Sequence, residues 1–531
     1  MSPNGVPKES GLTVWCVGFW IHGHPCRVFL CILLLFGVAC DRPGVAIDDA
    51  LRPVQRAQPG TVDAGRDAGV EPPFRFRDLA VTASLIDSRT YLGDAGPPYT
   101  AARPGTVFAR WRQRDGGWGM STGEEQTDGG YRIPNVPEGE AYVFFSGRPV
   151  VVTNASVVDM STFIGGRVNA FRAMANEPTD VDVFSSNTLP WGPDDSFVFA
   201  SFETAFAIDS RSPVALGSTV VGVRLPFHRV VLPLPEGSKG DTFSAFQHRE
   251  LDFADGGLRL AVAVAGGTVL APELTAGQSA TVSIPFTSGD AGATFDLDYP
   301  DSVATARQDL PFTPSATEAV LVVQAIPAFQ RIGVVQRGWY GNFTPVPVVR
   351  TVRLPPTLPA QQLQLEWVDL FRQTDLATIT AVALTVPVRG PTFTGSFQLV
   401  SQRWSPIEPG VPVDARIPLS PPRDLRLNGQ PATARSGVGL TPTISWAPPS
   451  RGNATLYRVT VFSVAPGAQP SLIVTFNTMK TQLEVPPGFL VSGTAYAIEV
   501  EALGGSVDLL KPAFTPPNAV IVPSITELFL P

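Results

Sequence analysis

The sequence predicts an all-β protein made of tandem β-sandwich domains behind a signal segment and a flexible tether. The 531 residues include 53 prolines and 49 glycines. Proline inside a helix costs about 3 kcal/mol, so this density argues against a helical protein. From Phe74 onward, short runs that alternate apolar and polar residues are separated by clusters of turn residues. Turn clusters at intervals of roughly 8–12 residues are typical of sandwiches and barrels. The apolar fraction of 44% is sufficient for buried cores.

Residues 1–39 are expected to be a signal segment that ends before Cys40. Residues 28–39 form an uncharged, mostly apolar run, and Arg27 directly precedes it. A short apolar run with a basic flank and small residues before a cysteine predicts export. The motif Gly37-Val38-Ala39-Cys40 resembles a bacterial lipoprotein box, which implies that Cys40 is acylated and becomes the new N-terminus. A plain cleaved signal and a membrane anchor are the alternatives. The run is too short for an anchor, since a spanning helix needs about 20 apolar residues.

Cysteine and histidine are too scarce after this segment for most catalytic chemistry. The four cysteines are Cys16, Cys26, Cys31 and Cys40. A chain that begins at an acylated Cys40 therefore has no disulfide, thiolate nucleophile or cysteine-bound metal. Only His228 and His248 remain of the four histidines. We expect no cofactor and no catalytic residue. The net charge of −8, without basic clusters, also argues against a nucleic-acid partner.

Composition and turn clusters divide the rest of the chain. Residues 40–73 are rich in Pro, Gly, Ala and Asp and contain no aromatic residue, which predicts a flexible tether. The predicted domains behind it cover residues 74–150, 151–295, 296–420 and 421–531. The two middle segments resemble no named family, and we expect each to be a β-rich domain.

The first domain ends in a recognisable pattern across residues 129–143. Tyr131 and Ile133 should face one side of a strand, Val136 should pack under a Pro/Gly turn, and Tyr142 should begin the return strand. The pattern resembles the end of the carboxypeptidase-regulatory-like family of small β-sandwiches. That resemblance implies a structural spacer or stalk module.

The last domain, residues 421–531, shows the pattern of a different sandwich. Leu490 precedes Tyr496 by six residues, at the entry to a late strand. This is the tyrosine-corner arrangement of sandwich folds. Together these residues resemble a fibronectin type III domain. The residues expected to fill its core are Trp446, Tyr457, Val459, Val461, Tyr496, Ile498 and Val500.

Clustered carboxylates in the middle region are the candidates for a metal site. Asp296, Asp298 and Asp301 lie close together in the sequence and could offer oxygen ligands to calcium. However, alternation with apolar residues, as in Asp296-Leu297-Asp298-Tyr299, is more typical of a solvated strand face. We therefore expect no metal site.

Aromatic residues in a glycine-containing segment are the candidates for ligand binding. Trp339, Tyr340 and Phe343 lie among Gly338, Gly341 and Asn342. On a turn, such rings can stack on sugars or on a partner's surface. Packing in a core or across strands is the alternative. The aromatic residues between Arg110 and Trp118 could likewise bind a ligand or pack in a core or across strands. Asp115-Gly116-Gly117 predicts a hairpin turn between the two tryptophans of this segment.

These features predict a noncatalytic lipoprotein of a bacterial cell envelope, periplasmic or surface-exposed, that acts in surface binding, adhesion or as a structural scaffold. Its expected partners are the membrane, through the lipid, and a polysaccharide or protein at the cell surface. The alternative is an extracellular hydrolase with its site in residues 151–420 and sandwiches as accessory modules.

Overall fold

The computed structural model describes residues 75–87, 100–102, 105–127, 129–145, 149–164, 179–201, 206–210, 214–226, 235–253, 257–275, 277–289, 291–326, 334–335, 346–368, 370–371, 375–505, 508–509, 514–515 and 517–531. The all-β prediction is confirmed: this part of the chain is mostly strand, with one α-helix, α2 (Tyr299–Arg307), and one 3₁₀ turn, η3 (Gly237–Lys239). Among these residues, no helix has the length and apolar character needed to cross a membrane.

The N-terminal sandwich, residues 75–164, packs two sheets around one core. Sheet β10–β1–β7–β6 faces sheet β9–β8–β4–β5, and β2, β3 and β11 form a small third sheet. Tyr131, Ile133 and Val136 are buried in this core, as predicted, and Tyr142 lies at the start of β8. The strands are β1 (Phe76–Thr82), β2 (Ser84–Asp87), β3 (Thr100–Ala102), β4 (Val107–Arg112), β5 (Trp118–Thr122), β6 (Glu124–Glu125), β7 (Tyr131–Pro137), β8 (Ala141–Phe145), β9 (Val150–Thr153), β10 (Val157–Asp159) and β11 (Thr162–Ile164).

The second sandwich, residues 179–289, places sheet β15–β12–β18 over sheet β14–β13–β16–β17. Alternation in β12 buries Val181 and Val183 and leaves Asp182 on the outer face, where it pairs with Arg224. The strands are β12 (Asp180–Ser186), β13 (Ser196–Ser201), β14 (Phe206–Ser210), β15 (Val220–Pro226), β16 (Thr242–Phe253), β17 (Leu258–Leu270), β18 (Ser279–Pro285) and β19 (Thr287–Ser288).

The third sandwich, residues 291–417, places sheet β24–β20–β27 over sheet β23–β21–β25–β26, and α2 follows β20. A short strand, β22, lies apart from both sheets and pairs with β36 near the C-terminus. The strands are β20 (Ala291–Leu297), β21 (Ala316–Ala325), β22 (Val334–Val335), β23 (Val346–Arg353), β24 (Gln361–Trp367), β25 (Leu376–Arg389), β26 (Thr394–Pro406) and β27 (Val413–Asp414).

The C-terminal sandwich, residues 421–531, has a fibronectin type III-like arrangement. Sheet β28–β31–β34, with β29 at its edge, faces sheet β33–β32–β35–β37. Trp446 and Tyr496 are only 5% and 2% exposed, and the Val491 amide donates a hydrogen bond to the Tyr496 hydroxyl at 2.9 Å. The predicted tyrosine corner is therefore confirmed. The strands are β28 (Arg423–Leu427), β29 (Gln430–Pro431), β30 (Arg435–Ser436), β31 (Thr443–Ala447), β32 (Leu456–Val464), β33 (Ser471–Thr478), β34 (Gln482–Glu484), β35 (Ala495–Gly504), β36 (Phe514–Thr515), β37 (Val520–Ile525) and β38 (Phe529–Leu530).

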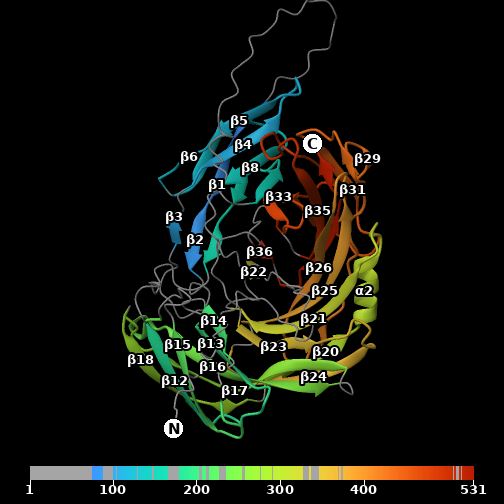
Figure 1. The fold of residues 1–531 in the computed structure, drawn as a ribbon. Coiled ribbons are helices and arrows are strands. Elements are labelled where there is room, and N and C mark those ends of the chain that lie inside the picture. Colours follow the sequence, from blue (N-terminus) through green and yellow to red (C-terminus); the bar gives the residue numbers. More distant parts are fainter. Residues whose placement is uncertain are drawn as a thin grey trace, which may run out of the picture.

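Strand pairing continues from one sandwich into the next. Strand β17 pairs with β23, β26 pairs with β37, and β33 pairs with β9. Within the described residues, one sheet of 19 strands thus passes through all four sandwiches. Figure 1 shows the result: the chain goes out through the blue and green sandwiches and returns, so that the red C-terminal sandwich lies beside the blue N-terminal one.

Candidate functional site

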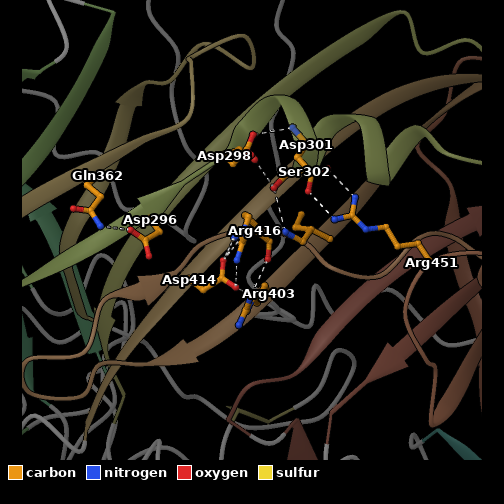
Figure 2. A network of polar contacts seen from close by, with 10 residues as sticks. Asp296, Asp298, Asp301, Ser302, Gln362, Arg403, Asp414, Arg416 and Arg451 are labelled. Atoms are coloured by element: carbon orange, nitrogen blue, oxygen red, sulfur yellow. Dashed lines mark hydrogen bonds and ion pairs between the residues drawn. The ribbon is translucent and has the colours of Figure 1, made fainter.

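The residues predicted to carry the lipid and to bind a ligand lie outside the described part of the chain. These are Cys40 and the aromatic residues Trp339, Tyr340 and Phe343. Their roles stay predictions. Of the predicted site residues, the structure places the acidic group, which lies where the third and C-terminal sandwiches meet (Figure 2).

The three aspartates of this group do not converge. The Asp296 side chain, on β20, accepts a hydrogen bond from Gln362 Nε2 at 2.9 Å. Asp298 caps α2, and Asp301, in the first turn of α2, pairs with Arg451. Within the described ranges, no group of three or more His, Cys, Asp or Glu side chains could hold a metal ion. Here the carboxylates face hydrogen-bond donors instead.

Helix α2 begins where it does because of its first residues. The Asp298 carboxylate accepts a hydrogen bond from the Asp301 amide at 3.1 Å, so it satisfies an amide that has no partner within the helix. Pro300 lies in the first turn, where its missing N–H costs nothing. The Asp301 carboxylate is also favourably placed near the positive end of the helix dipole. The sequence Asp298-Tyr299-Pro300-Asp301 was therefore an available signal for a helix start.

Arg451 joins this helix to the C-terminal sandwich. Its guanidinium contacts both carboxylate oxygens of Asp301, at 2.8 and 2.9 Å, and donates to Thr305 Oγ1 at 2.6 Å. Hydrogen bonding and the charge of Arg451 hold the pKa of Asp301 below its usual value, although partial burial opposes this. In turn, Asp301 raises the pKa of Arg451. A two-pronged contact of this kind fixes orientation as well as distance.

Backbone contacts hold the Arg451 loop in place. The Ser420 hydroxyl accepts hydrogen bonds from the amides of Ser450 and Arg451, at 3.0 and 3.1 Å. Gly452 has φ +77°, and a Cβ there would lie 2.9 Å from the Pro418 carbonyl oxygen. Only glycine fits such a position without strain. We call this set, Asp298, Asp301, Thr305, Ser420, Ser450, Arg451 and Gly452, the α2 joint.

A second cluster of charges lies beside the α2 joint, around Asp414 on β27. Arg416 Nε and Arg403 Nη1 lie 2.8 and 2.9 Å from its two oxygens. Burial raises the pKa of Asp414, but the hydrogen bonds from Arg416 and the charge of Arg403 outweigh it and lower that pKa to about 2. Arg403 Nη1 also donates to the Arg416 carbonyl at 3.0 Å, so the three residues form one network (Figure 2).

The chemistry of the site is therefore that of a polar joint between domains. Each carboxylate that contacts an arginine keeps a depressed pKa, which is unlike the raised pKa of a general acid. Sequence reasoning missed Arg403, Arg416 and Arg451 as partners. Arginine is frequent along the whole chain, and no local pattern marks these three.

Comparisons with known proteins add little. No family model matches the chain, and no curated protein matches it. The FN1–FN3 domains of chicken CNTN1 share 10% identity over 73% of this chain and 94% of theirs, with a TM-score of 0.14. A tetra-tandem repeat from the extending region of a large adhesion protein has 12% sequence identity to this chain. The match covers 83% of this chain and 98% of the repeat, with a TM-score of 0.13. The E. coli alpha-2-macroglobulin has 6% sequence identity to this chain. The match covers 82% of this chain and 27% of the macroglobulin, with a TM-score of 0.12. At such scores the fold assignment rests on this chain's own strand pairing.

Proposed function

We propose that the chain is a noncatalytic scaffold of a bacterial cell envelope, anchored through a lipid on Cys40, that presents its sandwiches for adhesion or surface binding. In this proposal residues 40–73 form the tether. The N-terminal sandwich acts as a spacer, as its resemblance to the carboxypeptidase-regulatory-like family implies.

The observation that carries the proposal is the passage of one sheet through all four sandwiches. Backbone hydrogen bonds join the second sandwich to the third, the third to the C-terminal one, and the C-terminal to the N-terminal one: β17 with β23, β26 with β37, and β33 with β9. Contacts between domains of one chain usually permit relative motion unless they are extensive. The pairings of β17 with β23 and of β26 with β37 restrict relative motion of the second, third and C-terminal sandwiches, which suits a structural part.

The α2 joint supports the same role. Arg451, Ser420 and Ser450 connect α2 to the C-terminal sandwich through side-chain and backbone hydrogen bonds. The Ser450 hydroxyl also donates to Asp309, just after α2. These contacts fix the angle between two sandwiches that already share the β26–β37 pairing.

Metabolic labelling tests the anchor. A clickable fatty-acid analogue should label the wild type, and Cys40→Ser should abolish the label and release the protein from the membrane fraction. Cys31→Ser is the matched control and should change neither result. An unlabelled wild type, or a mature N-terminus elsewhere, would contradict the anchor.

The aromatic residues Trp339, Tyr340 and Phe343 are the proposed ligand-binding group. The test compares the wild type with a triple alanine variant in adhesion to immobilised envelope polysaccharides and proteins. Binding should weaken at least tenfold while the melting temperature stays within about 2 °C. A large loss of stability would instead place the rings in a core.

A further inference from the structure

The first and last sandwiches meet although their contacting residues are far apart in the sequence. Strand β9 pairs in parallel with the end of β33, Val150 opposite Phe476 and Val151 opposite Asn477. Arg110, on β4, donates a hydrogen bond at 2.7 Å to the carbonyl of Pro487, a residue 377 positions away. The chain thus closes on itself through a strand contact of only two residue pairs.

Aromatic rings fill the centre of this contact. Phe144 stacks on Phe489 with ring centroids 5.9 Å apart, and Tyr142 meets Phe476 edge-on at 6.1 Å. All four rings belong to or pack against one apolar cluster. Such pairs add to the stabilisation from apolar burial, so they favour the closed arrangement.

Ion pairs surround these rings. Arg112 Nε contacts Glu484 Oε2 at 2.8 Å, and Lys480 pairs with Glu140. The side chains of Arg112 and Lys480 are 44% and 59% exposed. Charges in this position are screened by salt, so their contribution to closure should fall as ionic strength rises.

A buried polar group at the contact opposes closure, and a second one lies next to it on β32. Asn477 is fully buried, and neither its amide nitrogen nor its carbonyl oxygen has a hydrogen-bond partner. Arg458 lies directly opposite Asn477 on β32, and its Nη2 is also buried without a partner. Its other terminal nitrogen, Nη1, pairs with Glu501 at 2.9 Å. A buried polar group without a partner destabilises the state that buries it, and Asn477, which lies directly beside Val151 of β9, would gain water once the contact opens.

We propose that this contact is a releasable clasp: the N-terminal and C-terminal sandwiches separate at β9 and β33 while each stays folded. Aromatic packing and ion pairs favour the closed form, and the unsatisfied Asn477 side chain favours the open one. Opening exposes the edge of β33 and the rings of Tyr142, Phe144 and Phe489. The clasp goes beyond the scaffold role because it identifies a joint at which the closed arrangement can open, and it does not depend on the lipid anchor.

Distance measurement between spin labels tests the clasp. The chain from Asp41 onward has no cysteine, so Met120→Cys and Val491→Cys place one label on each sandwich at exposed positions. We expect a short and a long distance. Raising NaCl from about 0.05 to 1 M should increase the long-distance fraction at least threefold, and Glu484→Ala should do the same at low salt.

Two further variants sharpen the result. Asn477→Val should favour the closed form about tenfold, because it removes the unsatisfied amide; Asn477→Ala replaces it if valine prevents folding. Asp182→Ala breaks a comparable exposed pair, with Arg224, inside one sheet of the second sandwich, and should leave the distances unchanged.

One distance that neither salt nor Glu484→Ala changes would overturn the proposal. It would also be overturned if the long distance appeared only together with a loss of far-ultraviolet circular dichroism, because the sandwiches would then be unfolding instead of separating. A failure of the lipid-labelling experiment would leave these measurements unaffected.

Discussion

At the residue scale, His248 is the clearest case of a group whose environment changes its chemistry. It lies on β16 and is 1% exposed. Burial disfavours the charged imidazolium, the nearby Arg350 adds to this, and together they lower the pKa of His248 to about 3, even though a backbone contact with Pro347 acts in the opposite direction. The histidine is therefore a neutral core residue at the pH values at which an ordinary histidine titrates.

This shift predicts an acid-sensitive fold. In the unfolded chain His248 binds a proton near pH 6.5, whereas in the folded chain it does so only near pH 3. Between these values the unfolded state binds more protons, so stability falls as pH falls below about 6.5. Urea unfolding at pH 6.5, 6.0, 5.5 and 5.0 should show this decline, and it should be shallower in His248→Leu. If the free energy of unfolding fell equally steeply with pH in the wild type and in His248→Leu, the lowered pKa of His248 would be contradicted.

The contact between Arg451 and Asp301 gives a second prediction at this scale. Arg451→Ala removes the main cause of the lowered pKa of Asp301, which should return toward 3.8. NMR titration of the Asp301 carboxyl carbon measures this pKa directly. Arg416→Ala is the control: it should change the pKa of Asp414 much more than that of Asp301. A pKa of Asp301 that does not change in Arg451→Ala would show that the ion pair is absent in solution.

At the scale of the elements, strands could be predicted from alternation because each sandwich buries one face of each sheet. Tyr457, Val459 and Val461 follow this rule, and all three are buried in the core. Helix α2 was missed because its start follows a strand pattern without interruption. Only the capping residue Asp298 and Pro300 mark it.

The core of the C-terminal sandwich provides the prediction for this scale. Trp446→Ala should destabilise the sandwich by ~3–5 kcal/mol, because it leaves a cavity beside Tyr457, whose ring lies 5.2 Å away. Tyr496→Phe keeps the ring but leaves the Val491 amide without its acceptor, and should cost about 1–2 kcal/mol. Denaturant unfolding of the full chain, followed by tryptophan fluorescence, measures both. If the two substitutions lower the free energy of unfolding by the same amount, Trp446 does not fill the core as described.

At the scale of the whole molecule, the sequence shows that there are several β-domains but not how they meet. The pairing of β9 with β33 and the pairing of β26 with β37 join residues that no local pattern connects. The same holds for Arg451 and Asp301, whose contact depends on how two sandwiches pack. Edge strands carry no signal for their partner, because almost any extended backbone can complete a sheet edge.

Small-angle X-ray scattering of the chain from Asp41 onward, at low salt, tests the closed arrangement of the four sandwiches most directly. A compact chain of this length has a radius of gyration of about 23 Å, and with the tether we expect a value below about 30 Å. Four separate sandwiches in a line, each with a radius of gyration near 13 Å, would instead give about 40 Å. The lower value would support one continuous sheet that returns the last sandwich to the first, and the higher value would contradict it.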